Sequence, residues 1–306
     1  MNNNINTFFN FGKNYYYIID TSYLVYLCAS TSFKNYCFQE DIRKELLNPD
    51  FDPTIDPEFN IIFEQYFKNK IKSAFRQVTD SILNKPIKIF FARDCRRTNI
   101  WRREIFPEYK LQRDVADHSK DKFNTSKVFS YAYSVIIPNY CDDINGVILQ
   151  NEVAEADDII AVLSDYILSK NDNNHVIILS SDRDMVQLCN DKTHIITASG
   201  EIRDPSHEFR RMLKDDKLPD LTANDFLLFK ILIGDKSDNI PNIKSQLGIK
   251  TALKYVLDKS HTQLRHLLSE DINIAKGFKR NKELISMKDI PNYIKESIIE
   301  NIEQYF

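Results

Sequence analysis

The sequence predicts an α/β protein with a mostly parallel central sheet, helices on both faces of that sheet, and a helical C-terminal region. Short apolar runs rich in β-branched and aromatic residues predict buried strands. The runs lie at 15–19, 87–93, 146–149, 175–179 and 193–197. Helical periodicity between the runs gives the alternating pattern of a parallel sheet. From about residue 221 only helical spacing remains, so we expect an α/β domain over 1–220 and a helical region over 221–306.

Local signals place the C-terminal helices. Thr222 to Asp225 has the form of a capping box, and Gly234 ends the apolar run that follows. Two further helices are expected near 250–258 and 261–269, and isoleucines at helical spacing predict a last one over 291–305. Residues 48–60, with three prolines and several acids, are expected to form a surface loop, and the asparagine-rich N-terminus is expected to fray.

Composition excludes several classes of protein. The 306 residues contain no stretch of roughly 18 apolar residues, which disfavours a membrane span. The N-terminus lacks the pattern of a secretory signal, so we expect an intracellular, cytoplasmic protein. Five scattered cysteines disfavour a disulfide framework and a zinc ribbon. Only 6 glycines are present, with no glycine-rich phosphate loop. The net charge of -3 means that nucleic-acid binding would need local basic patches.

Acidic residues gather where the predicted strands end. Four of them follow strands, a further group opens the helix after residue 154, and a last pair follows Gly234. They are Asp20, Asp94, Asp182, Asp184, Glu155, Asp157, Asp158, Asp235 and Asp238. Each alone is typical of a turn or of a helix start. Converging on one sheet edge, they would repel one another unless a cation neutralised them.

The acids predict a metal site for phosphoester hydrolysis. Oxygen-only ligands favour Mg²⁺ or Mn²⁺ over zinc. Two such ions about 4 Å apart suit in-line displacement at phosphorus. The six histidines show no ligand spacing, and no Ser/His/Asp or Cys/His grouping stands out. Hydrolysis of a phosphodiester or phosphate ester is therefore the function that the residues favour.

Residues 93–113 form a basic segment with interleaved aromatic side chains. Seven residues are basic and three acidic, and Trp101, Phe106 and Tyr109 lie among them. Basic side chains bind phosphates, and aromatic rings stack on exposed bases. An ordinary solvated charge run with its aromatic residues in the core remains the alternative. Because the segment starts at Asp94, we favour the interpretation that it delivers a polynucleotide to the metals.

Five blocks, in this order and spacing, resemble the structure-specific 5′ nucleases. This family contains flap endonucleases, the 5′-nuclease domain of bacterial DNA polymerase I and phage 5′ exonucleases, and the chain is similar above all to the T-even phage ribonuclease H. The blocks are Ile19-Asp20, Asp94 through Trp101-Arg102-Arg103 to Tyr109-Lys110, Glu155-Ala156-Asp157-Asp158, Ser180 to Asp184, and Gly234 to Pro241.

The resemblance implies a PIN-like 5′ nuclease fold and two Mg²⁺ ions, for which Mn²⁺ can substitute. Asp20, Asp94, Glu155 and Asp157 would surround the first ion. The ligands of the second would come from Asp158, Asp182, Asp184, Asp235 and Asp238, some of them bridging or acting through water. The assignment of each acid to one ion stays open.

The resemblance also implies two nucleic-acid elements. Residues 96–125 would form a helical arch in which Arg102, Lys110 and Arg113 approach the scissile phosphate or steer the strand. Other members of the arch would contact the strand, namely Arg96, Arg97, Trp101, Arg103 and Tyr109. Residues 222–258 would contain a helix–three-turn–helix element that grips the duplex, with Gly248, Lys250 and Thr251 in its turn and a monovalent cation, K⁺, bound there. One glycine and the proline of the family's turn are missing, and Asn242 stands where glycine is common.

The expected function is a Mg²⁺-dependent 5′-3′ exonuclease and flap endonuclease. Its substrates would be DNA and RNA–DNA hybrids with a 5′ flap, nick or fork, and its role the removal of RNA primers in phage DNA replication, in the host cytoplasm. A sliding clamp, through a short apolar peptide at Ile5–Phe9, and a single-stranded DNA-binding protein are candidate partners of a monomer. Two alternatives stay open: a PIN-like single-strand ribonuclease and a non-catalytic DNA-junction binder.

Overall fold

The computed structural model describes residues 12–39, 50–82, 86–114, 123–215 and 217–306. The expected fraying of the N-terminus and the peptide Ile5–Phe9 lie outside these residues, as do positions 115–122 of the predicted arch and positions 48–49 of the predicted loop. In the described part of the chain, no helix is both long and apolar enough to cross a bilayer.

The sheet confirms the predicted strands. It consists of β1 (Asn14–Asp20), β2 (Lys88–Arg93), β3 (Val147–Gln150), β4 (Asn174–Leu179), β5 (Thr193–Ile196) and β6 (Ile202–Arg203), in the order β3-β2-β1-β4-β5-β6. Every pairing is parallel except the one between β5 and β6. The sequence did not predict β6, because two residues carry no measurable alternation. Both neighbours of β1 run parallel to it, so the carboxyl ends of β2, β1 and β4 meet at one edge.

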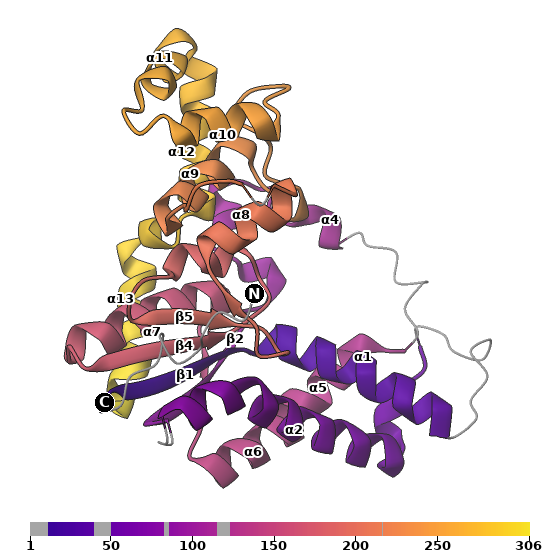
Figure 1. The fold of residues 1–306 in the computed structure, drawn as a ribbon. Helices are drawn as coiled ribbons and strands as arrows, with labels where there is room; N and C mark the ends of the chain where they lie inside the picture. The colour runs from indigo at the N-terminus through magenta and orange to yellow at the C-terminus, as the bar shows by residue number, and fades with distance from the viewer. Residues whose placement is uncertain (1–11, 40–49, 83–85, 115–122, 216) are drawn as a thin grey trace.

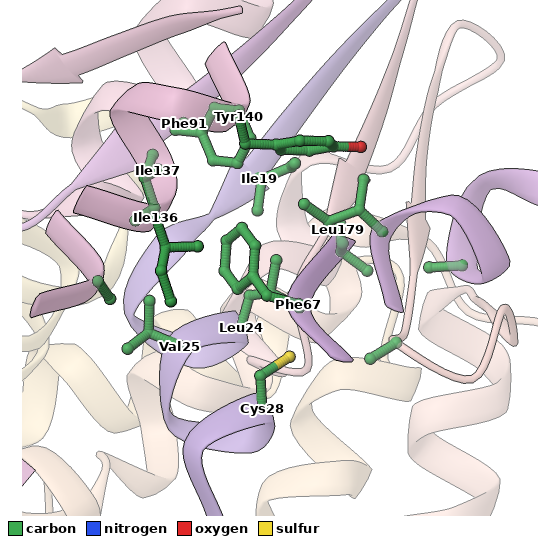
Figure 2. Close-up of a cluster of buried hydrophobic side chains, with 14 of the residues drawn as sticks. Ile19, Leu24, Val25, Cys28, Phe67, Phe91, Ile136, Ile137, Tyr140 and Leu179 are labelled. Atoms are coloured by element: carbon green, nitrogen blue, oxygen red, sulfur yellow. The ribbon is translucent and has the colours of Figure 1, made fainter. Parts of the chain in front are cut away.

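Four helices cover one face of the sheet. They are α1 (Thr21–Gln39), α2 (Pro57–Ile82), α5 (Thr125–Tyr131) and α6 (Ile137–Ile144). Figure 1 shows α2 and α6 below the strands and α1 to their right. Tyr17 and Ile19 of β1 face this layer, where Figure 2 shows Ile19 among Leu24, Phe67 and Leu179. The alternation along β1 sends Ile18 to the opposite core.

The second face carries α7 (Ala156–Lys170) and α13 (Asn292–Ile302). The predicted isoleucine stripe of the tail is confirmed, because Ile294, Ile298 and Ile302 are buried against α7 and the sheet. The end of the chain therefore returns to the α/β body, and Figure 1 shows the C-terminus beside the start of β1. The division of the chain at residue 220 stays a prediction.

Helices after β6 form a separate core. They are α8 (Pro205–Leu213), α9 (Ala223–Ile233), α10 (Ile249–Leu257), α11 (Thr262–Glu270) and α12 (Ile272–Ile285), with α10 to α12 farthest from the sheet in Figure 1. The capping box of Thr222 and Asp225 is confirmed, and so are the helices expected near 250–258 and 261–269. The sequence did not predict α12.

One local expectation needs correction. The loop expected over 48–60 ends early, because Pro53–Ile55 form a 3₁₀ turn and Pro57 begins α2, where proline is favoured in the first turn. The segment after β2 consists of short pieces: a 3₁₀ turn at Arg97–Asn99, α3 (Arg102–Ile105) and α4 (Leu111–Asp114). Between α5 and α6, residues Ala132–Ile136 form a π-helical turn.

Candidate active site

The predicted acids meet at the carboxyl edge of the sheet. Asp20 is the last residue of β1, Asp94 follows β2, and Asp182 follows β4. Glu155 is the N-cap of α7, so the acids of residues 155–158 occupy the first turn of that helix. A 3₁₀ turn at Asp184–Leu188 packs against α9 and carries Asp184 towards Asp235, which follows that helix.

Asp20 and Asp94 are held by short hydrogen bonds from their surroundings. Asp20 accepts a bond from the Ser180 hydroxyl at 2.8 Å and one from the backbone N–H of Tyr23 at 3.2 Å. Asp94 accepts a bond from the Ser22 hydroxyl at 2.6 Å and one from the backbone N–H of Ala156 at 2.8 Å. These donors come from α1, the β4 loop and α7, so three elements fix the two carboxylates.

Glu155 lies within a buried group of basic and hydroxyl donors. Its carboxylate accepts bonds from Lys110 Nζ at 2.5 Å, from the Tyr109 hydroxyl at 2.9 Å and from Arg102 Nη1 at 3.1 Å. Burial alone would raise the pKa of Glu155, but the charges of Lys110 and Arg102 outweigh burial and lower it. Glu155 is therefore a carboxylate at neutral pH.

Asp158 is the site of a buried ion pair, which contradicts its assignment as a metal ligand. Arg102 donates to both of its oxygens, Nη2 to Oδ1 at 2.7 Å and Nη1 to Oδ2 at 2.8 Å. Trp101 Nε1 and the backbone N–H of Glu155 donate to the same Oδ2. Four donors bond to its two oxygens, and its exposure is 0%. Asp158 therefore fixes the position of α3 through Arg102.

The same contacts correct three assignments within residues 96–113. Trp101 and Tyr109 are 2% and 3% exposed, so neither ring is a surface for stacking on a base. Arg102 is 3% exposed, and its guanidinium is occupied by Asp158, Glu155 and the carbonyl of Leu284. It therefore positions the chain and does not reach a substrate phosphate. The alternative of aromatic residues in the core is correct for these two rings.

Lys110 and Arg113 connect this segment to the C-terminal region. Arg113 Nη2 donates to Asp238 Oδ1 at 2.6 Å, and Lys110 Nζ lies 3.7 Å from Asp238 Oδ2. The Arg113 side chain is 44% exposed and can also face a ligand. Arg96, Arg97 and Arg103 keep at least part of their surface accessible. Their contact with nucleic acid stays a prediction.

A second acidic group, Asp184 and Asp235, is bridged by a lysine that the sequence did not predict as a site residue. Lys230 of α9 forms an ion pair with Asp184 at 3.0 Å and another with Asp235. Burial would raise the pKa of Asp235, but Lys230 more than offsets this and lowers it. The signal was present, since Lys230 interrupts an otherwise apolar run from Phe226 to Ile233.

The first acidic group, which consists of Asp20, Asp94, Asp157 and Asp182, has no lysine bridge of this kind among the described residues. Burial, and then the charge of Asp94, raises the pKa of Asp20 to about 7. Burial and the charge of Asp182 raise the pKa of Asp157 well above its usual range. Burial raises the pKa of Asp184 to about 7 despite Lys230, with Asp182 contributing. Asp182 thus acts on both acidic groups, which places them side by side.

The donor set fits a hard divalent cation. Among the described residues, no three His, Cys, Asp or Glu side chains stand at ligand distance from a common point. The acids that surround Asp182 nevertheless raise one another's pKa values, which is the electrostatic condition that a bound cation relieves. All of them offer oxygen ligands, as Mg²⁺ and Mn²⁺ require.

The raised pKa of Asp20 predicts that the difference in stability between wild type and Asp20→Asn depends on pH. The pKa of Asp20 is 3.8 in its ordinary state and about 7 in the fold, so between these values the folded state holds a proton that the unfolded state has lost. Stability therefore falls as pH rises through this window. We expect the melting temperature of Asp20→Asn, measured in EDTA, to exceed that of wild type by a margin that grows from pH 5 to pH 8. A margin that does not change with pH would contradict the coupling.

The turn after α9 contains the predicted duplex-binding residues. Gly248 caps α10, and Gly248, Lys250 and Thr251 are all exposed. Gln246 has a φ of 63°, a conformation that favours glycine, at the position of the glycine that is missing from this turn. Asn242 Nδ2 donates to the carbonyl of Leu247 at 2.7 Å, so one carbonyl of the turn is already engaged. K⁺ binding here stays a prediction.

Comparisons with known sequences agree on one family. The model of the 5′-3′ exonuclease N-terminal resolvase-like domain matches residues 64–215. DNA polymerase I of Lactococcus lactis is 29% identical over 223 residues, 71% of this chain and 23% of that protein. DNA polymerase I of Bacillus subtilis is 34% identical over 138 residues, 45% of this chain and 15% of that protein. The chain thus spans less than a quarter of the length of these relatives.

Solved structures share the fold over nearly the whole chain. The bacteriophage T5 protein co-crystallised with metal ions matches with a TM-score of 0.61 and 16% identity, covering 95% of this chain and 99% of that one. The T5 flap endonuclease in a pseudo-enzyme–product complex with DNA and metal ions matches with a TM-score of 0.60 and 16% identity, covering 95% and 96%. The 5′ nuclease fold predicted from the sequence is confirmed.

Proposed function

Because the chain belongs to the 5′-3′ exonuclease family, we propose that it is a divalent-metal-dependent 5′ nuclease acting on phosphodiester bonds at 5′ ends and flaps. The observation that carries this proposal is the convergence of Asp20, Asp94, Asp157 and Asp182 at one sheet edge, where burial and mutual repulsion raise the pKa values of two of them. The T5 relative with DNA and metal ions bound supports the same reaction class.

Some residues of the chain would bind the metal ions, and others would position the groups that react. Asp20, Asp94, Asp157 and Asp182 would hold one ion, and Asp184, Asp235 and Asp238 a second, with Glu155 beside them. When bound, such ions lower the pKa of an attacking water and stabilise charge on the phosphate. Arg102 and Tyr109 fix Glu155, while Lys110 and Arg113 remain our candidates for the phosphate. An ion between Asp184 and Asp235 must displace the ammonium of Lys230.

The narrower assignment rests on the sequence resemblance. We propose two Mg²⁺ ions, replaceable by Mn²⁺, substrates of DNA and RNA–DNA hybrid, and a role in removing RNA primers during phage replication. We also propose a sliding clamp and a single-stranded DNA-binding protein as partners of a monomer.

The reaction is tested with a nicked duplex that carries a 5′-labelled flap. We expect wild-type protein to release short 5′ fragments in Mg²⁺ and to release none in EDTA. Fragment lengths separate cleavage at the junction from stepwise removal of nucleotides. Tight binding without cleavage in either Mg²⁺ or Mn²⁺ would instead favour the junction-binding alternative.

A further inference from the structure

A buried carboxylate on α8 is surrounded by arginines and has no role in the function proposed so far. Glu208 is 0% exposed. Its oxygens lie 3.3 Å from Arg203 Nε, 3.5 Å from Arg183 Nε and 3.9 Å from Arg211 Nη1. We call these four residues the arginine cluster. Arg211 belongs to α8 itself, whereas the other two arginines come from β6 and from the loop after β4, so the cluster connects three segments of the chain.

Two of these arginines hold the loop of residues 180–184, which carries two of the predicted metal ligands. Arg183 lies between Asp182 and Asp184 in the sequence. Arg203 donates from Nη1 to the carbonyl of Ser181 at 2.7 Å. Because Arg203 is only 7% exposed, little water competes for its contacts. The loop is therefore tied to Glu208 once through a backbone carbonyl and once through a side chain.

The helix that carries Glu208 is a fixed support for these contacts. Asp204 caps α8 with its side chain. The Phe209 ring meets Phe226 and Phe229 of α9 edge-on, with centroids 5.5 and 5.2 Å apart. A cap at its start and an aromatic contact beside Glu208 hold the helix in place. The position of Glu208 is thus set independently of the loop that it holds.

The loop needs such support because its acids repel their neighbours. The Ser180 hydroxyl donates to Asp20 at 2.8 Å and accepts a bond from the backbone N–H of Asp182 at 3.0 Å. Asp182 in turn repels Asp20 and Asp157, which contributes to the raised pKa values of both. Without a cation, this repulsion favours movement of the loop away from the other acids. The contacts of the arginine cluster oppose that movement.

We propose that Glu208 and Arg203 are positioning residues of the metal site, which hold the 180–184 loop in its cation-binding conformation before a cation arrives. The inference rests on the proposed function and deepens it. A preformed site does not lose binding energy to the ordering of its ligands. Because both residues act through the loop, their loss should weaken metal binding more than it slows cleavage at saturating metal. Both lie outside the blocks that resemble the family.

The test measures Mn²⁺ binding without substrate, from the electron paramagnetic resonance signal of the free ion. We expect Arg203→Gln to weaken Mn²⁺ binding about tenfold, the effect of losing one hydrogen bond from a charged donor. In flap cleavage, the Mg²⁺ concentration that gives half of the maximal rate should rise by a similar factor, while the maximal rate falls less than about threefold. Loss of a positive charge near acids would by itself tighten cation binding, so the sign of the change separates positioning from charge.

The matched control is Arg211→Gln, which removes the same charge beside Glu208. Arg211 contacts Glu208 from the same helix, and its side chain is 45% exposed, so its loss cannot release the loop. Its Mn²⁺ affinity should stay within about twofold of wild type. If Arg203→Gln does not fold, as judged by circular dichroism, Arg203→Lys keeps the buried charge but lacks the fork that reaches two partners. We expect it to weaken Mn²⁺ binding about fivefold.

Amide hydrogen exchange in EDTA supplies a readout that needs no metal. The peptide that contains residues 180–184 should exchange faster in the folded Arg203 variant than in wild type. An equal exchange rate, or a Mn²⁺ affinity that is unchanged or tighter, overturns the positioning role, even if the melting temperature falls. Wild-type protein that binds Mn²⁺ but cleaves no flap would instead refute the proposed function and leave the positioning role standing.

Discussion

Asp182→Asn is expected to reduce the rate of flap cleavage by about 10³-fold, or roughly 4 kcal/mol of transition-state stabilisation, while the affinity for flapped DNA changes little. The reason is the position of Asp182 between the two acidic groups, since its charge contributes to the raised pKa values of Asp20, Asp157 and Asp184. Single-turnover cleavage in Mg²⁺ and anisotropy binding in EDTA measure the two quantities separately.

The chain offers a matched control for this substitution. Glu152 is an exposed acid shortly before α7 and lies outside the acidic group, so Glu152→Gln removes one charge without touching the site. We expect its cleavage rate to stay within about twofold of wild type, as for surface substitutions in general. If Asp182→Asn kept the wild-type rate, the assignment of the acids to the reaction would be wrong.

Arg102→Met is expected to lower the free energy of unfolding by about 3–5 kcal/mol, the usual result of removing one partner of a buried ion pair. The substitution leaves Asp158 at 0% exposure and Glu155 at 4% without the guanidinium that binds both. It also removes the bond from Arg102 Nε to the carbonyl of Leu284, which connects α3 to α12. Urea unfolding followed by circular dichroism measures the loss.

Two comparisons separate the buried pair from a general effect of charge. Arg96→Gln, at an exposed position of the same segment, should change stability by less than about 0.5 kcal/mol. Arg102→Lys keeps the charge but loses the two-pronged geometry, so it should recover only part of the stability. Wild-type stability in Arg102→Met would show that the ion pair is not needed for the fold.

The sequence was sufficient to predict the strands of the sheet and the edge at which the acids meet. Continuous apolar runs have few alternatives to buried parallel strands, so five strands were predicted at their observed places. Because parallel strands end at the same edge, Asp20, Asp94 and Asp182 could be placed together without any coordinates. The capping box at Thr222 and the stop at Gly234 depend on residues within one helical turn, and were predicted for the same reason.

The partners of the charged side chains could not be predicted. Within residues 93–113, the count of basic residues suggested a surface for nucleic acid, yet Arg102 and Lys110 are buried against Glu155 and Asp158. Sequence separations of 45 and more lie between these partners. Which acid pairs with the Arg102 guanidinium over such a sequence separation depends on how α3 packs against α7. No local sequence pattern encodes that packing.

By itself, then, the sequence determined the elements whose signals are local: strands, helix caps, and the acids at strand ends. The tertiary structure alone decided which of these acids remain electrostatically uncompensated. Asp158 is paired with Arg102 and Asp235 with Lys230, whereas Asp20 and Asp157 face other carboxylates. The physical reason is that a charge in a low-dielectric interior is governed by neighbours within a few ångströms, and those neighbours come from elements far apart in the chain.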